Sequence, residues 1–215
     1  MNEDSILLVD KPAGITSFGV VARVRRRLSE QLGKKAKVGH TGTLDPFATG
    51  LMIIVTGKEC RNAMNYSKLD KEYEAVIRLG QVSTTGDPEG EITNVSDTQP
   101  TKEAIEAALE QFRGEITQRP PIFSAIKING RRAYDLARKG EVVEMPERQV
   151  TVFSLELLEY TYPDIRVRTH VSSGTYIRSL AEDIGAVLAT GAYCVELRRT
   201  KVGEWSVIGA EPIAK

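Results

Sequence analysis

The residues best suited to chemistry lie in one short segment, Gly39 to Gly50, which holds His40, Asp45 and Pro46 among three glycines. A proline disfavours helical geometry in the residue before it, so Asp45 should have an extended or turn backbone. Glycines let backbone segments approach closely or adopt positive φ. Catalytic side chains often sit on such loops. An aspartate before a proline is also ordinary turn chemistry, so the segment alone leaves both interpretations open.

The charged residues are segregated along the chain. Lysine and arginine total 29 and aspartate and glutamate also total 29, so net charge alone does not indicate a nucleic-acid partner. Separated basic groups can still give a neutral protein a positive face for phosphates. Each group alone is better explained as a solvated helix face, whereas the three together leave a shared anionic partner open. The groups are Arg23, Arg25, Arg26, Arg27, Lys34, Lys35 and Lys37; Lys127, Arg131, Arg132, Arg138 and Lys139; and Arg198, Arg199 and Lys201.

The hydrophobic pattern predicts the elements that must position these residues. Apolar and alternating runs predict strands at 6–9, 51–55, 73–79, 150–160 and 165–171, with a last strand pair across 193–207. Helical spacing predicts helices from Ser17 to Gly33, from Thr101 to Gly114, and across 176–188, with Ser17 and Thr101 as N-caps. Residues 82–99 suggest a hairpin or a long loop. Because strands and helices alternate without a regular βαβ rhythm, the fold class should be α+β.

Size and composition suit one domain that spans residues 1–215. The chain has 41% hydrophobic residues, no apolar run of membrane-spanning length, and an acidic N-terminus unlike a signal peptide. Cys60 and Cys194 lack metal-ligand spacing, so we expect reduced thiols, no metal and a cytoplasmic location. The segment 119–146, which is basic and is bounded by prolines, is the one candidate insertion.

Five further motifs accompany the Gly39–Gly50 segment, in order along nearly the whole chain. They are Lys11-Pro12-Ala13-Gly14-Ile15-Thr16-Ser17; Lys71-Glu72-Tyr73-Glu74 with Leu79-Gly80; Pro121 to Lys127 with Gly130 and Tyr134; Ser173-Gly174-Thr175-Tyr176-Ile177-Arg178; and Glu196-Leu197-Arg198-Arg199-Thr200. In type and order they resemble the motifs of the TruB family of pseudouridine synthases. The resemblance implies a mixed, largely antiparallel central sheet with flanking helices and loops.

The resemblance also implies the catalytic residues. Asp45 matches the family's catalytic aspartate, Tyr73 matches the aromatic residue that stacks on the target base, and Arg178 matches the arginine that pairs with that aspartate. The implied reaction is the isomerisation of a uridine, uridine-55 in the T loop of tRNA, to pseudouridine.

The remaining implied site residues bind the substrate. Tyr176 and Leu197 match residues that line the base pocket, and His40 matches the loop histidine that helps hold the RNA with its base everted. Lys127 and Arg132 lie in the 119–146 insertion, which resembles the family's RNA-gripping insertion.

Physical chemistry agrees with these roles. A carboxylate can attack the sugar or remove a proton from it while uracil leaves as an anion, and the sequence leaves these two roles of Asp45 open. An arginine beside the carboxylate would keep it ionised, and aromatic rings would stack on a flipped base. The reaction needs no redox step and no phosphate energy, so we expect no cofactor.

Two other functions remain as alternatives. One is a non-catalytic module on the same scaffold that binds or folds tRNA; the other is a hydrolase that uses Asp45 with His40 or His170. Asp45, Tyr73 and Arg178 together favour the enzyme, because RNA binding alone does not require a buried carboxylate near phosphates. We expect a monomer that binds the tRNA T-stem loop, with no membrane and no obligate protein partner. Family members usually continue into a C-terminal RNA-binding domain, whereas this chain ends at Lys215, so we expect no PUA-type domain.

Overall fold

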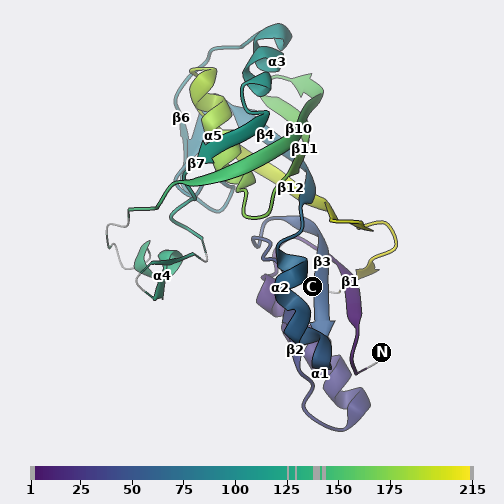
Figure 1. Cartoon of the computed structure of the whole chain (residues 1–215). Helices are drawn as coiled ribbons and strands as arrows, with labels where there is room; N and C mark the ends of the chain where they lie inside the picture. The colour runs from purple at the N-terminus through teal and green to yellow at the C-terminus, as the bar shows by residue number, and fades with distance from the viewer. Residues whose placement is uncertain (1–2, 125, 129, 138–140, 142–143, 214–215) are drawn as a thin grey trace. The chain divides into compact units, whose positions relative to one another are not determined.

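The computed structural model describes residues 3–124, 126–128, 130–137, 141 and 144–213 (Figure 1). The chain divides into two compact units, each described by itself. Unit 1 comprises Met1–Glu74 and Leu197–Lys215, and unit 2 comprises Ala75–Glu196. Two long strands, β4 (Lys71–Leu79) and β12 (Ala192–Val202), contribute residues to both units. That residues 1–215 form a single domain stays a prediction.

Unit 1 is built on β3, the most buried strand of this unit. The elements that lie wholly in this unit are β1 (Ile6–Lys11), α1 (Ser17–Leu32), β2 (Val38–His40), β3 (Thr49–Thr56), the 3-10 helix η1 (Gly57–Asn62), α2 (Ala63–Ser67), β13 (Trp205–Ser206) and β14 (Glu211–Pro212). The strand order is β14-β1-β3-β12, with β2 paired to β3 and β13 paired to β12. β1 and β2 run antiparallel to β3, whereas β12 runs parallel to it. The core includes Leu51, Ile53, Val55 and Val202.

Helix α1 has the predicted buried face and the predicted end, but a different cap. Thr16 is the N-cap, and its hydroxyl accepts a hydrogen bond from the Gly19 amide at 2.9 Å. The prediction that Ser17 caps the helix was therefore wrong, because Ser17 is the first helical residue and its side chain turns inward to the Gly39–Gly50 segment. Gly33 ends the helix with φ 65°, as predicted.

Unit 2 packs two helices against a sheet. Besides its parts of β4 and β12, it holds β5 (Gln81–Ser83), β6 (Ile92–Asn94), α3 (Lys102–Glu110), β7 (Gly114–Gln118), β8 (Lys127–Ile128), β9 (Arg131–Arg132), α4 (Ala133–Ala137), β10 (Arg148–Thr161), β11 (Asp164–Val171) and α5 (Ile177–Val187). The strand order is β12-β4-β11-β10-β7, and β10 is antiparallel to both β11 and β7. Helix α3 contacts β10 and α5.

The periodic segments agree with the sequence. β4 alternates between buried and partly buried residues, and the 82–99 segment contains the short β5–β6 hairpin. The helix that begins after Thr101 ends at Glu110, however, with Gln111 as its C-cap. Gly114 does not close that helix as predicted, because its φ of 91° begins β7 instead.

The α+β class and the largely antiparallel sheet are confirmed. The described part of the chain contains no helix that is both long enough and apolar enough to cross a membrane.

Candidate active site

The loop that carries Asp45 lies between β2 and β3, and a buried lysine fixes it from one side. Lys11 at the end of β1 is fully buried, and its ammonium donates to the carbonyls of Pro12, Ile15 and Pro46 at 3.0, 2.9 and 3.1 Å. The Gly14 amide donates to the same Pro46 carbonyl at 2.8 Å. The peptide between Pro46 and Phe47, one residue beyond Asp45, therefore has a fixed position.

The start of α1 fixes the residue before Asp45. The buried Ser17 hydroxyl donates to the Leu44 carbonyl and accepts from the Leu44 amide, both at 2.8 Å. The Asp45 carbonyl in turn accepts from the Ala48 amide at 3.2 Å, which closes a tight turn. The loop that carries the carboxylate is thus tied to α1 and to its own backbone.

A buried arginine holds the other side of the loop. Arg199 on β12 is 2% exposed, and its guanidinium donates to the carbonyls of Leu51, Gly42 and Thr43 at 2.7, 3.2 and 3.4 Å. Its backbone approaches Gly50 so closely that a Cβ there would lie 2.3 Å from the Arg199 carbonyl oxygen, and Gly50 has φ +107°. Only glycine fits this position.

The third basic group of the sequence does not form one exposed face, because one of its members is buried. Arg199 is buried among loop carbonyls, Arg198 pairs with Asp10 at 2.7 Å, and Lys201 pairs with Glu72 at 3.2 Å. The hypothesis that these three cations serve an anionic partner is wrong for Arg199 in particular.

His40 begins the same loop at the end of β2. Burial lowers the pKa of its imidazole, and the nearby Arg199 charge lowers it further. Its Nδ1 is buried and finds no hydrogen-bond partner among the described residues. The imidazole is therefore neutral near pH 7, and one ring nitrogen is available to a polar group that enters the site.

Tyr73 and Leu197 complete the predicted site residues of unit 1. Tyr73 on β4 and Leu197 on β12 are each 8% exposed. The Leu197 carbonyl accepts from the Thr49 hydroxyl at 3.5 Å, a long contact between β12 and the start of β3. Both side chains are buried enough to form apolar walls.

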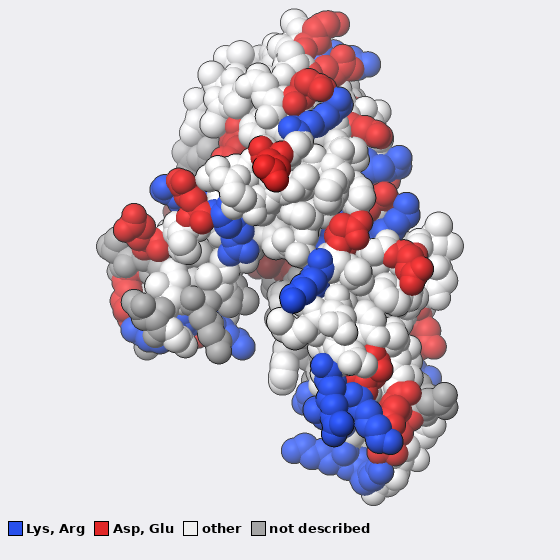
Figure 2. All heavy atoms as spheres, in the orientation of Figure 1, with Lys and Arg blue, Asp and Glu red and all other residues white. Residues whose placement is uncertain are grey.

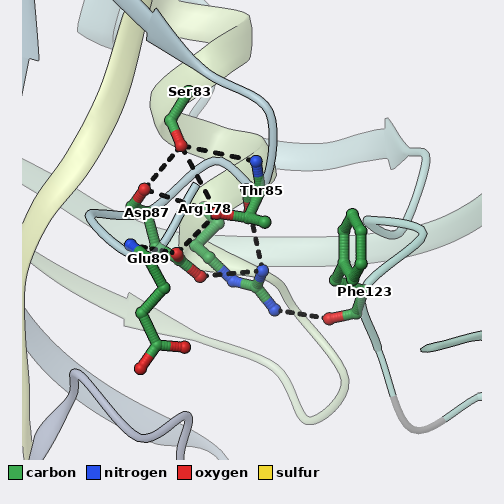
Figure 3. A network of polar contacts seen from close by, with 6 residues as sticks. All are labelled: Ser83, Thr85, Asp87, Glu89, Phe123 and Arg178. Carbon is green, nitrogen blue, oxygen red and sulfur yellow. Dashed lines mark hydrogen bonds and ion pairs between the residues drawn. The ribbon is translucent and has the colours of Figure 1, made fainter. Parts of the chain in front are cut away.

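In unit 2, a polar network anchors Arg178 on α5 (Figure 3). Its guanidinium donates to the carbonyls of Thr85 and Phe123 at 2.8 and 2.9 Å and pairs with the Asp87 carboxylate at 3.1 Å. The side chains of Arg178 and Asp87 are 3% and 5% exposed, so this ion pair is deeply buried.

The sequence analysis did not single out Asp87. It lies in the turn after β5, where the Thr85 hydroxyl and the Glu89 amide donate to its carboxylate at 2.6 and 3.0 Å. In the sequence it is one of several polar residues in a stretch that suggests turn chemistry. Its burial, which the sequence does not reveal, is what sets it apart.

A hollow of about 650 Å³ lies in unit 2, and two carboxylates of α5 line it. Burial raises the pKa of Glu182, as does the neighbouring Asp183, and burial raises the pKa of Asp183 itself. Glu182 also feels the charges of Arg178 and Asp87. The charge on the Glu182 carboxyl therefore depends on Asp183 and on the buried pair.

Tyr176 is the N-cap of α5 and is held through its backbone. Gln118 exchanges two hydrogen bonds with it, accepting from the Tyr176 amide at 2.7 Å and donating to the Tyr176 carbonyl at 2.9 Å. The Arg148 guanidinium lies 5.4 Å from the centre of its ring. The ring is half-buried.

The insertion contains a short β8–β9 hairpin followed by α4. Lys127 pairs with Arg132 across the hairpin backbone. Arg132 is exposed and donates to the Tyr134 hydroxyl at 2.8 Å, and Arg131 pairs with Glu141 at 2.7 Å. Two further members of this basic group, Arg138 and Lys139, lie outside the described residues.

The predicted site residues thus fall into two sets. Asp45, His40, Tyr73 and Leu197 belong to unit 1; Arg178, Tyr176, Lys127 and Arg132 belong to unit 2. Pairing of Asp45 with Arg178 stays a prediction. Among the described residues, no group of three or more histidine, cysteine, aspartate or glutamate side chains could hold a metal ion.

A fixed aspartate loop beside an α+β sheet is the arrangement that the sequence motifs predict, and comparisons with known proteins identify the class. The model of the TruB family pseudouridylate synthase N-terminal domain matches residues 26–177. A model of the tRNA pseudouridylate synthase B C-terminal domain matches residues 178–210. The chain therefore belongs to the TruB family of pseudouridylate synthases, which are isomerases.

Curated relatives agree with this assignment. A protein of Phocaeicola vulgatus named tRNA pseudouridine synthase B is 48% identical over 94% of this chain and 87% of its own length. Its counterpart from Parabacteroides distasonis is 47% identical over 93% of this chain and 86% of its own.

Solved structures support the fold. A chain in the crystal structure of a Cbf5-Nop10-Gar1 complex has a TM-score of 0.73 and 30% identity, covering 98% of this chain and 52% of that one. A chain of an H/ACA RNP bound to a substrate RNA containing 2'-deoxyuridine has a TM-score of 0.70 and 28% identity, covering 98% of this chain and 51% of that one.

Proposed function

We propose that this chain converts a uridine of tRNA, uridine-55 of the T loop, to pseudouridine, with Asp45 as the catalytic carboxylate. The observation that carries the proposal is the way the Asp45 loop is fixed. Lys11 and Arg199 bind its carbonyls from two strands, and Ser17 binds Leu44. A loop that served only as a turn would not need two buried cations to hold its backbone.

The reaction exchanges one bond of C1' of the ribose for another. The bond from C1' to N1 of uracil breaks, the base turns, and a bond from C1' to C5 forms. The proton on C5 is lost to water and N1 gains a proton, so the reaction needs no other reactant. Asp45 either attacks C1' or removes a proton from the sugar, and both routes begin with an ionised carboxylate.

The other site residues would prepare the base and the carboxylate. Arg178, anchored by Asp87, would keep Asp45 ionised through its positive charge. Tyr73 would stack on the flipped uracil, and Tyr176 and Leu197 would form walls of its pocket. His40, neutral near pH 7, would form a hydrogen bond that helps to hold the RNA with its target base flipped out.

The insertion would grip the T-stem loop through Lys127 and Arg132. Exposed cations such as Arg132 bind phosphates without sequence preference, which positions the RNA without selecting it. That the chain acts as a monomer in the cytoplasm remains our prediction from the sequence.

The test is release of tritium from a tRNA transcript labelled at uracil C5. We expect release by the wild-type chain and a loss of at least about 1000-fold in Asp45→Asn, because the amide can neither attack nor take a proton. Asp97→Asn, which changes an exposed aspartate, is the matched control and should keep the wild-type rate.

The same assay addresses the alternative of a non-catalytic tRNA-binding module. Tight binding of tRNA by the wild-type chain without any tritium release would favour that module and exclude the enzyme. Release that persists in a correctly folded Asp45→Asn variant would remove Asp45 from the mechanism.

A further inference from the structure

One basic surface of unit 1 has no role in the site described above. It runs along α1 and the segment that follows, and we call it the α1 basic strip. Its members are Arg23, Arg26, Arg27, Lys34, Lys35 and Lys37. All are exposed except Arg23, which is half-buried. In Figure 2, lysine and arginine side chains gather over the lower part of the view, where Figure 1 places the α1 and β2 labels.

Ion pairs within the fold neutralise little of this strip. Lys34 pairs with Glu3 at 2.7 Å and Arg27 with Glu211 at 3.9 Å, but the side chains of both pairs are more than half exposed and such pairs contribute little. Across the part of the chain that the structure describes, Arg26, Lys35 and Lys37 have no ion pair.

The arrangement also works against the stability of α1. Arg23, Arg26 and Arg27 are spaced at i, i+3 and i+4, where like charges repel one another by a few tenths of a kcal/mol. Glu30 is the one acidic residue of the helix. Folding therefore does not explain the clustering of these charges, whereas an anionic ligand would.

The three arginines line a hollow suited to phosphate. The hollow has a volume of about 340 Å³, and its wall also includes the apolar side chains of Leu7 and Val9. Guanidinium groups present forked donors that match phosphate oxygens, and an apolar wall strengthens their electrostatic attraction. Glu30 and Glu211 also line the hollow and reduce its positive charge, so a single small anion would bind there weakly. A polyanion would contact the other cations of the strip as well.

The position of the strip indicates which polyanion would bind to it. Helix α1 begins at Ser17, whose hydroxyl binds Leu44 next to the catalytic aspartate. With a rise of 1.5 Å per residue, Arg26 lies about 14 Å along the helix from Ser17, and the last helical residue about 23 Å from it. The strip therefore leads away from the loop that receives the uridine.

We infer that the α1 basic strip binds the phosphate backbone of the tRNA beyond the T loop, about 14 Å or more along α1 from the catalytic loop. The inference rests on the proposed function. Its contacts are electrostatic, so they increase affinity and leave the chemical step unchanged.

The experiment compares two RNAs and two pairs of substitutions. The RNAs are a full tRNA transcript and a T-loop hairpin whose stem ends before the strip begins. The variants are Arg26→Gln with Arg27→Gln, and Lys35→Gln with Lys37→Gln. The control, Lys102→Gln with Arg166→Gln, removes two exposed charges of unit 2.

For the full transcript we expect each strip variant to raise KM about 10-fold and to reduce the slope of log Kd against log salt by about one for each lost contact. kcat from tritium release should not change, and the short hairpin should bind the variants and the wild type alike. Equal thermal melting of all chains would show that the exposed substitutions leave the fold intact.

Two results would overturn the inference. If the strip variants match the control on the full transcript, the strip does not bind RNA, and an acidic protein surface becomes its candidate partner. If the short hairpin loses as much affinity as the full transcript, the strip does not contact the RNA beyond the loop. Failure of the proposed function is distinguishable from both, because the wild-type chain would then release no tritium from either RNA.

Discussion

Lys11 and Arg199 are single buried residues whose charged groups donate to backbone carbonyls in and beside the Asp45 loop. Each cation serves carbonyls from segments far apart in the sequence, such as Pro46 for Lys11 and Gly42 for Arg199. A buried cation keeps its charge more easily when several carbonyl dipoles point at it. The same contacts hold the loop backbone, so stability and the geometry of the loop depend on the same side chains.

Replacing Lys11 by methionine should therefore affect both properties. The methionine fills a similar volume but removes the ammonium from three carbonyls, of which Pro46 keeps its bond from the Gly14 amide. The lost bonds cost about 3 kcal/mol of unfolding free energy. We also expect a slower single-turnover rate of tritium release, because the Pro46 carbonyl loses one of the two donors that hold it. Urea unfolding and rapid-quench kinetics would measure the two effects.

The matched control for this prediction is Lys58→Met. Lys58 has a side chain that is 83% exposed, so its replacement should leave the unfolding midpoint and the rate close to those of the wild type. If Lys11→Met unfolded at the wild-type urea concentration, the carbonyls would not depend on the ammonium, and our account of the loop would fail.

At the scale of elements, the turn after β5 and helix α5 act together through the buried pair of Asp87 and Arg178. Asp87→Ala removes the charge partner and leaves the bonds from the guanidinium to the Thr85 and Phe123 carbonyls in place. Removal of one partner from a buried ion pair typically costs about 3–5 kcal/mol. We expect lower stability and a kcat reduced at least about 10-fold, because Arg178 loses its position. KM should change little, because the residues that bind the RNA keep their positions.

Asp97→Ala serves as the comparison, since this residue lies in the segment between β6 and α3 and is exposed. A kcat of Asp87→Ala equal to that of Asp97→Ala would show that Arg178 needs no acidic anchor. A change confined to KM would instead indicate that Asp87 acts in RNA binding.

Elements with a strong local pattern were predictable from the sequence. The alternation of β4 and the caps Thr101 and Gly33 depend on neighbouring residues, so the pattern contains the information. Ser17 was misassigned because its hydroxyl binds Leu44, a partner that the local sequence does not reveal. A tertiary contact of this kind overrides a local preference.

The candidate site was predictable where a motif identifies it and not where burial does. Asp45 and Arg178 came from the resemblance to a family. Asp87, Lys11 and Arg199 act through burial and through partners on other elements, and a single charged residue in a sequence gives no sign of either. Arg199 was even grouped with exposed cations, because its neighbours Arg198 and Lys201 are more exposed.

At the scale of the whole molecule, a chain with zero formal net charge carries its cations in separate places. The α1 basic strip belongs to unit 1, and the insertion with Lys127 and Arg132 belongs to unit 2. Net neutrality reduces non-specific binding to other polyanions, while local positive surfaces still attract RNA phosphates. The affinity for tRNA should then depend on both surfaces and should fall steeply with salt.

This division makes a prediction about the combined loss of both surfaces. If each surface contacts its own phosphates, Lys127→Ala with Arg132→Ala should weaken tRNA binding and reduce the salt slope independently of the strip substitutions at Arg26 and Arg27. The four-residue variant should then show a Kd within about a factor of two of the product of the separate effects, because independent sites contribute additively. Filter binding at several salt concentrations would measure this. A combined loss much smaller than that product would mean that the two surfaces act on the same phosphates, or that loss of one already releases the RNA from the other.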